Sequence, residues 1–358
     1  MRLHPLKKHG FTLVEMLVVV GIIAVLAAIL VPTIASALRR AKVAQIAFDV
    51  SNLETAITNY ASATGDNPPD FSDQGIVQRH LEKAYRRANA NERAFALALA
   101  GNVNTGKAAI IDPAEALVFW LGGLSKDERR PFTGPGGPIL WVDADTDGVI
   151  DINFDEISYN PSRENAYFPF EQQRLSLKEV TVGGGIRYHS NDESTLHSRT
   201  DDVFPVFSPP SRPQPYVYFD SRTYLLSIMS SNSSDPPVLI QTYPSRLTGD
   251  YVPPAALTMG VARPYLTTNR DPNFFNASTF NWRAHYAAEP KEYQIISAGL
   301  DGDYGADWNP AGLKIFETGA LLRADQQPWG GGTARGYQDG DLDNITNFSE
   351  GTLGDRLP

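Results

Sequence analysis

Carboxylates recur at alternate positions in one short stretch of the sequence, Asp143 to Asp151. Counted from Asp143, acids occupy positions 1, 3, 5 and 9, a glycine occupies position 6, and a valine could supply its backbone carbonyl at position 7. This is the order of oxygen ligands in an EF-hand calcium loop, in which the glycine permits a sharp turn. Position 12, usually a bidentate acid, is Phe154, and Asp155 and Glu156 follow it. We expect bound Ca²⁺, with a solvated Asp/Gly turn as the alternative. The expected ligands are Asp143, Asp145, Asp147 and Asp151.

Glu15 stands out because its neighbours are apolar. It is the one ionisable residue in the 21 positions (31 − 11 + 1) from Phe11 to Val31, which as a helix would measure roughly 31 Å and match the hydrocarbon core of a bilayer. A carboxylate there costs on the order of 2.5–3.5 kcal/mol, so a partner is expected. If the chain were cut after Gly10, the new α-ammonium of Phe11 in one subunit could neutralise Glu15 of its neighbour.

The stretch Gly10 to Glu15 reads Gly-Phe-Thr-Leu-Val-Glu and follows a short leader with three cations. It resembles the class III signal of type IV pilins and type II secretion pseudopilins, and the resemblance extends to about Tyr60. The resemblance implies that a prepilin peptidase cuts after Gly10 and methylates the new amino group of Phe11. It also implies that Glu15 is the assembly glutamate and that Pro32 is the proline at the end of the membrane span.

Two other interpretations of this segment were considered. The first is an ordinary secretory signal peptide with an Ala35-Ser36-Ala37 cleavage site, but the apolar run is longer than an h-region of about 7–15 residues. The second is an uncleaved anchor in which Glu15 is incidental. The flanking charges do not decide the orientation, because cations beyond the span offset those of the leader. These cations are Arg39, Arg40 and Lys42.

A second acidic loop lies toward the end of the chain. The stretch Tyr293 to Gly305 resembles the strand and calcium loop of the major pseudopilin of type II secretion, followed here by an insertion of roughly thirty residues. The resemblance implies a Ca²⁺ site in which Asp301 matches the first acid and later acids precede Ile345. Which of the later acids bind the ion is left open. The expected ligands are Asp301, Asp303, Asp341 and Asp343.

Composition narrows the possible functions. The chain has 31 Lys and Arg residues against 41 Asp and Glu residues, a formal net charge of −10, and this argues against nucleic acid as a partner. It contains no cysteine, so metal ions or packing must fix its loops. No His-Glu-x-x-His, Gly-x-Ser-x-Gly or Walker-type motif is present, and we expect no catalytic residues and no enzyme activity.

The remaining patterns predict an α+β, pilin-like fold. Apolar residues at helical spacing extend the N-terminal helix to Thr64, a second helix is predicted over 81–100, and Asp112 is expected to cap a third. Alternation predicts a strand at Tyr293–Ser297, and shorter strands are expected at Tyr216–Phe219, 224–226 and 238–240. The expected divisions are a leader (1–10), a transmembrane helix (11–32), its periplasmic half (33–64), a helical insertion (65–160) and a β-rich head (161–358).

These observations predict a structural pseudopilin of a type II secretion system. Its helices would pack into a filament with copies of itself or with other pseudopilins, on an inner-membrane assembly platform, with a single membrane span and the head in the periplasm. The alternatives are a type IV pilin for adhesion, motility or DNA uptake, and a membrane-anchored periplasmic enzyme or binding protein.

Overall fold

The computed structural model describes most of the chain and divides it into two compact units, residues 1–45 and 46–358. Several predicted features lie outside the described residues: the cleavage-site residues Gly10 and Phe11, the calcium ligand Asp341 and the strand at 224–226. The described residues are 12–102, 109–152, 156–182, 185–192, 203–223, 227–228, 238–239, 262, 264–270, 285–289, 292–305 and 342–356.

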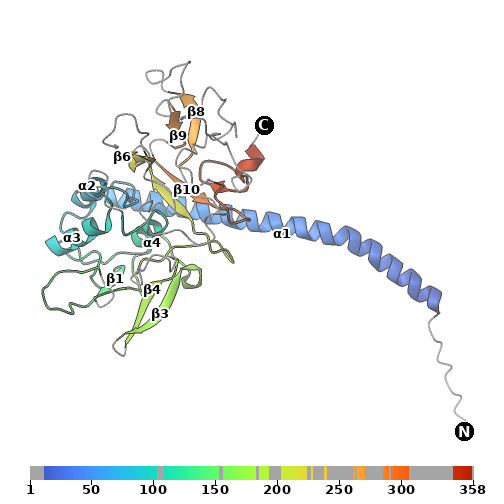
Figure 1. Cartoon of the computed structure of the whole chain (residues 1–358), viewed down its shortest axis with the longest axis horizontal. Coiled ribbons are helices and arrows are strands. Elements are labelled where there is room, and N and C mark those ends of the chain that lie inside the picture. Colours follow the sequence, from blue (N-terminus) through green and yellow to red (C-terminus); the bar gives the residue numbers. More distant parts are fainter. Residues whose placement is uncertain are drawn as a thin grey trace, which may run out of the picture. The chain divides into compact units, whose positions relative to one another are not determined.

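Helix α1 is one continuous element of 52 residues, Leu13–Thr64 (Figure 1). It ends at the predicted residue, because Gly65 adopts a positive φ of 82° and donates its N–H to the carbonyl of Ala61. All residues from 12 to 42 are exposed, whereas the second half of the helix has a buried face. That face consists of Ile46, Asp49, Val50, Leu53, Ala56, Ile57 and Tyr60, so the predicted helical spacing marked the buried side correctly.

Three short helices follow in the unit 46–358: α2 (Gln74–Ala84), α3 (Ala90–Leu99) and α4 (Glu115–Leu121). The single helix predicted over 81–100 is wrong, because α2 ends at Ala84. Asn89 is the N-cap of α3 and accepts a hydrogen bond from the amide of Glu92 at 2.9 Å. The predicted cap at Asp112 is confirmed. Its carboxylate accepts the amides of Ala114 and Glu115 at 2.7 and 2.9 Å.

An aromatic cluster joins these helices to the end of α1. Trp120 of α4 stacks on Phe71, with ring centroids 5.3 Å apart, and meets Tyr60 of α1 edge-on at 6.1 Å. The Trp120 indole donates to the carbonyl of Pro69 at 2.9 Å, and the Tyr60 hydroxyl lies 2.7 Å from Nε2 of His80. These buried polar groups are paired, as a well-packed core requires. Figure 1 shows α2, α3 and α4 gathered beside the C-terminal part of α1.

The largest sheet of the described residues has three antiparallel strands in the order β11-β10-β5. Its strands are β5 (Val217–Asp220), β10 (Tyr293–Ser297) and β11 (Ile345–Thr346). Strand β10 occupies the residues predicted for it, and Ile296 is paired with Val217 on one side and Thr346 on the other. This sheet therefore places Asp301, after β10, close to Asp343, before β11.

Four two-stranded antiparallel sheets complete the described β structure. They are β1 (Ile139–Trp141) with β2 (Ile157–Tyr159), β3 (Leu177–Val182) with β4 (Gly185–Ser190), β6 (Ser227–Ile228) with β7 (Val238–Leu239), and β8 (Leu266–Arg270) with β9 (His285–Ala287). The fold is thus α+β, with a long N-terminal helix followed by small helices and antiparallel sheets, as predicted. The loop that contains Asp143 connects β1 to β2. The pairing of these two strands therefore fixes both ends of the loop.

A buried ion pair ties α1 to the β-rich part of its unit. Asp49 of α1 lies 2.5 Å from the guanidinium of Arg174 and accepts a hydrogen bond from the Tyr216 hydroxyl at 2.8 Å. The guanidinium also lies over the ring of Phe207, 4.1 Å from its centroid. Both charged side chains are at least nine-tenths buried, so neither can rely on water if its partner is removed.

We expect Arg174→Ala to lower the free energy of unfolding by about 3–5 kcal/mol, because it leaves the Asp49 carboxylate buried without its counter-ion. Replacing both partners with apolar residues (Asp49→Leu with Arg174→Met) should recover most of that loss. Urea unfolding of the full chain in detergent, followed by tryptophan fluorescence, measures both. Equal destabilisation by Arg174→Ala and by Lys178→Ala, at an exposed position on β3, would contradict the assignment.

A second buried network surrounds Asp220, at the end of β5. Its carboxylate lies 2.5 Å from the Arg222 guanidinium, which also pairs with Asp66 at 2.6 Å, and the buried Asp70 accepts the amide of Asp220 at 3.0 Å. Burial raises the pKa of Asp220 from 3.8 to about 6, although Arg222 opposes the change. The folded protein therefore holds this proton more tightly than the unfolded chain does.

This difference predicts a pH dependence of stability. Because the folded-state pKa is raised, the free energy of unfolding should fall as the pH rises from about 4 to about 6, by up to about 3 kcal/mol for this group. Urea titrations of the wild type and Asp220→Asn at several pH values isolate its contribution. The wild type should lose stability relative to the variant between pH 4 and pH 7; a constant difference would show that Asp220 titrates normally.

Candidate functional site

Glu15 lies in the first turn of α1 and makes a capping box with Thr12. Its Oε2 accepts hydrogen bonds from the Thr12 amide and hydroxyl, both at 2.8 Å, and its own amide donates to the Thr12 hydroxyl at 3.2 Å. The apolar stretch of α1 is long enough to cross a membrane by length and composition, and none of it is buried within the structure. Glu15 is therefore the one carboxylate in the exposed apolar stretch of α1 up to Val31, and this helix begins three residues after the predicted cleavage-site residue Gly10.

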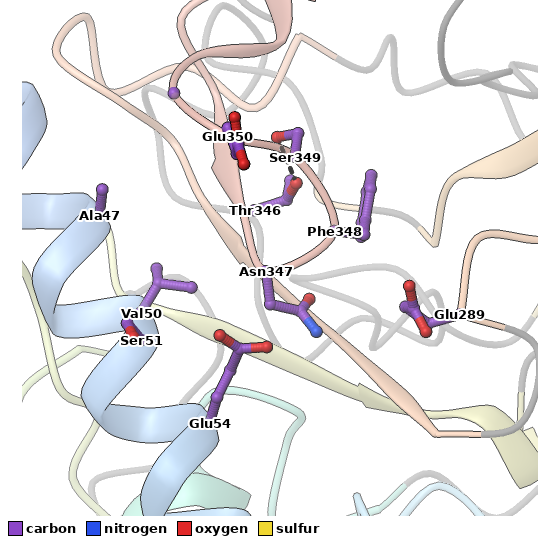
Figure 2. Close-up of a pocket in the computed structure, with 11 residues that line it drawn as sticks. Ala47, Val50, Ser51, Glu54, Glu289, Thr346, Asn347, Phe348, Ser349 and Glu350 are labelled. Carbon is purple, nitrogen blue, oxygen red and sulfur yellow. Dashed lines mark hydrogen bonds between the residues drawn. The ribbon is translucent and has the colours of Figure 1, made fainter.

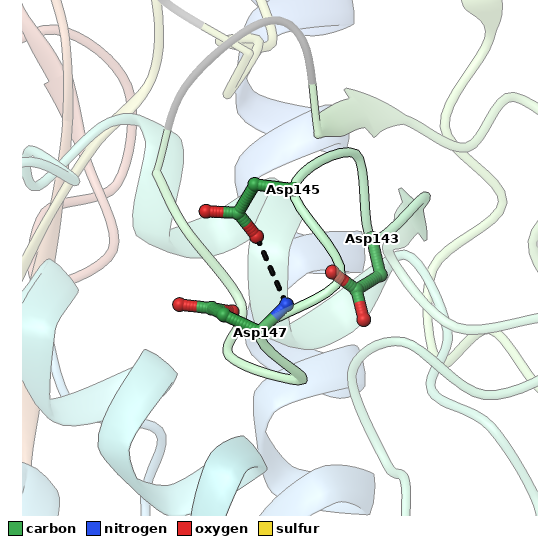
Figure 3. A group of neighbouring side chains, drawn as sticks. All are labelled: Asp143, Asp145 and Asp147. Atoms are coloured by element: carbon green, nitrogen blue, oxygen red, sulfur yellow. Dashed lines mark hydrogen bonds between the residues drawn. The ribbon is translucent and has the colours of Figure 1, made fainter.

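The loop after β1 folds as the EF-hand-like spacing predicts. Side-chain oxygens of Asp143, Asp145 and Asp147 all lie within 4.8 Å of one another (Figure 3). The Asp147 amide donates to Asp145 at 3.1 Å, and the amide of Gly148 donates to Asp143 Oδ2 at 3.1 Å. Gly148, the predicted turn glycine, has a positive φ of 78°. The turn thus brings three carboxylates together, as a hard cation requires.

Glu156 is a potential ligand that the loop spacing did not identify. Oxygens of Asp145, Asp151 and Glu156 also lie within 4.8 Å of one another. Glu156 is 3% exposed, and its Oε2 accepts the Asp151 amide at 3.2 Å. Since Phe154 stands at the twelfth position, Glu156 is the residue placed to supply the closing acid. The sequence did contain a signal for this role, because Glu156 is an acid only two residues beyond the twelfth position of the loop.

The charge of this loop favours a cation. Oδ1 of Asp143 is buried and has no hydrogen-bond partner, and unpaired buried carboxylate oxygens are costly. Every group of three or more potential metal ligands within the described parts of the chain includes Asp145. The donors are all carboxylate oxygens, the type that Ca²⁺ and Mg²⁺ prefer over softer metals. The residues present therefore fit a hard divalent cation.

The second predicted loop is arranged differently. Asp343 is 8% exposed, and its Oδ2 accepts the amides of Leu300 and Asp301 at 2.7 and 2.9 Å, while its Oδ1 is buried without a hydrogen-bond partner. Partial burial and the neighbouring Asp343 raise the pKa of Asp301 to about 6, with a hydrogen bond from the Asp303 amide opposing the rise. Asp301 and Asp343 therefore face each other.

Asp303 is not gathered with these two acids. The carboxylates of Asp301, Asp303 and Asp343 do not all lie within 4.8 Å of one another among the described residues, and Asp341 lies outside the description. The Asp303 carboxylate instead accepts the amide of Gly305 at 2.8 Å. The unpaired oxygen of Asp343 next to Asp301 still fits a cation, and of the three predicted ligands that the structure describes it places these two together.

Comparison with known proteins supports the interpretation of the N-terminal segment. Residues 5–31 match the family described as "Prokaryotic N-terminal methylation motif". The chain is also similar to "Fimbrial protein EcpB" of Eikenella corrodens, at 31% identity over 85 residues that cover 24% of this chain and 54% of that protein. It thus spans about half the length of this curated relative. No solved structure matches the chain. A prepilin-type methylation motif is therefore joined to a helix able to span a membrane.

Calcium should stabilise the folded chain if these acids bind it. Ca²⁺ at about 100 times its Kd adds about 2.7 kcal/mol per site to the free energy of unfolding, and we expect a higher Tm in CaCl₂ than in EDTA. Asp145→Asn should abolish the effect of the first loop and Asp343→Asn that of the second, whereas Glu179→Gln, at an exposed position on β3, should not. An unchanged Tm in excess EDTA would count against both sites.

Proposed function

We propose that this chain is a filament subunit of the pilin and pseudopilin type, processed by a prepilin peptidase between Gly10 and Phe11 and methylated on the new amino group of Phe11. The observation that carries the proposal is Glu15, the one Asp or Glu within the matched methylation motif, residues 5–31, on the apolar first part of α1. An acid in such a helix is stable in lipid when a cation sits beside it. A processed neighbour would supply that cation from its amino end.

Assembly then follows from the two halves of α1. The exposed apolar half, including Pro32, would hold the subunit in the inner membrane as a single span and pack laterally against other subunits, while the half from Ile46 carries the folded unit. Lateral packing of apolar helices removes lipid-exposed surface and satisfies Glu15 at the same time. Periplasmic placement of the head, an inner-membrane assembly platform and either identical or related pseudopilins as neighbours complete the proposal.

Within this class we favour a type II secretion pseudopilin. The absence of cysteine and the two acidic loops support calcium rather than a disulfide as the means of fixing the head. A structural subunit needs no catalytic residues, and we propose no enzyme activity and no nucleic-acid partner. The second candidate is a type IV pilin, which is favoured by the similarity to a protein named as fimbrial. Deletion of the gene distinguishes them: loss of secreted proteins supports the first, and loss of surface pili supports the second.

Mass spectrometry of the native protein tests the processing step. We expect a mature chain that begins at Phe11 and carries one added methyl group on its amino nitrogen. The replacement Glu15→Val should abolish filaments but leave the Tm of the folded unit unchanged, because Glu15 belongs to the other compact unit, residues 1–45. Met16→Val, one position away, is the matched control. A mature protein that still begins at Met1, or that is trimmed after Ala37 and released as a monomer, would refute the proposal.

A further inference from the structure

A groove of about 650 Å³ lies between the second half of α1 and the turn that follows β11. Ala47, Ser51 and Glu54 of α1 form one wall, and residues 346–351 form the other (Figure 2). Figure 2 shows the Glu54 side chain directed from the helix toward Asn347 and the open space. None of the described residues fills this groove.

The groove is strongly acidic. Glu54, Glu289 and Glu350 all line it, and no Lys or Arg of the described residues forms an ion pair with Glu54 or Glu289. Partial burial raises the pKa of Glu54; a hydrogen bond with Asn347 opposes the rise, and the negative charges of Glu289 and Glu292 add to it. Carboxylates that repel one another in a half-buried groove favour a cationic occupant.

An exposed aromatic residue lies on the same half of α1 as the groove. Phe48 follows the lining residue Ala47 on α1 and is 62% exposed. In the second half of the helix, from Ile46 to Thr64, it is the one large apolar side chain that is exposed. A large exposed aromatic side chain together with charged groups is a common composition of protein interfaces, which have an apolar anchor and a polar surround.

The same chain carries a segment with the complementary features. Arg39, Arg40 and Lys42 are exposed, and none of them forms an ion pair within the described structure. Ile34 and Leu38, one helical turn apart on α1, are 55% and 58% exposed. The segment 34–42 thus presents apolar side chains followed immediately by three cations.

We propose that the acidic groove binds the segment 34–42 of α1 from a second copy of this chain. Phe48 of one copy packs on Ile34 of the other, and Glu54 faces Arg40. Both pairs are separated by 14 positions (48 − 34 and 54 − 40), so one parallel register satisfies them together. Fourteen residues make almost four helical turns, so the two positions of each pair lie at nearly the same angle around α1, at an axial offset of about 21 Å. The proposal rests on the filament function proposed above.

This contact involves a different neighbour from the one that meets Glu15. The pairing of Glu15 with a Phe11 amino group implies an offset of about four residues, or about 6 Å, which is far smaller than 21 Å. Each subunit therefore has two distinct α1 contacts, one inside the membrane span and one at the base of the folded unit. The second contact is water-exposed and depends on charge, so salt should weaken it.

Because the chain has no cysteine, disulfide cross-linking tests the register directly. Two differently tagged full-length copies are co-expressed, one with Ser51→Cys in the groove and the other with Ala37→Cys, which is 14 positions earlier. A disulfide requires Cβ atoms about 3.5–4.5 Å apart, and we expect at least about tenfold more mixed dimer than with the off-register pair Ser62→Cys and Ala37→Cys. Equal yields from the two pairs would overturn the proposal.

Charge exchange tests the contact independently. Glu54→Lys and Arg40→Glu should each reduce filament yield about tenfold, and the double variant should recover most of it, because the interaction is pairwise. Glu179→Lys, on the exposed face of β3, makes the same charge change and should have no effect, and the Tm of each variant reports folding. Normal filaments from Glu54→Lys would refute the groove contact. If the wild type forms no filaments, the proposed function is refuted. The disulfide cross-linking experiment in membranes then still tests the contact between the groove and the segment 34–42.

Discussion

Helix α1 must satisfy two different surroundings, and this constraint organises the rest of the chain. From Ile46 onward its apolar face is covered by the folded unit, but residues 12–42 are exposed throughout and predominantly apolar up to Val31. So much exposed apolar surface is not stable in water and needs lipid or other helices around it. The folded unit therefore covers only the second half of α1. The uncovered apolar half requires lipid or other helices as its surroundings.

The folded unit is attached to the second half of α1 by polar as well as apolar contacts. Asp49 supplies a buried carboxylate on the helix, and Arg174 and Tyr216 come from segments more than a hundred positions away in the sequence. A buried charge with defined partners tolerates little sliding or rotation, because any displacement leaves it unpaired. The aromatic cluster around Trp120 fixes the other end of the same half-helix.

Features set by local sequence were predictable. The end of α1 at Thr64, the cap at Asp112 and the strand Tyr293–Ser297 each depend on neighbouring residues, such as a glycine with positive φ, a capping acid or strict alternation. The break between α2 and α3 was missed because it lies at Tyr85 to Asn89, where neither glycine nor proline marks it, and an asparagine cap is common in other settings. Glu156 was missed as a ligand because its position depends on the backbone path beyond the ninth residue of the loop.

The pairing of Asp301 with Asp343 could be expected only from a family resemblance, since 41 residues separate them, and the sheet that joins β10 to β11 brings them together. The acidic groove had no sequence signal at all. Its carboxylates come from α1, from Glu289 two residues after β9 and from the turn after β11, and only the folded chain shows that they share one surface.

The capping box at Thr12 has a consequence for how subunits meet. One oxygen of the Glu15 carboxylate accepts hydrogen bonds from two donors of its own chain, and these bonds restrict the conformations of the side chain. The other oxygen then points in a defined direction. Less side-chain conformational entropy would be lost when a neighbouring subunit docks. In the proposed filament, this threonine three positions before the acid would set the geometry of the Glu15 carboxylate before a neighbouring subunit docks.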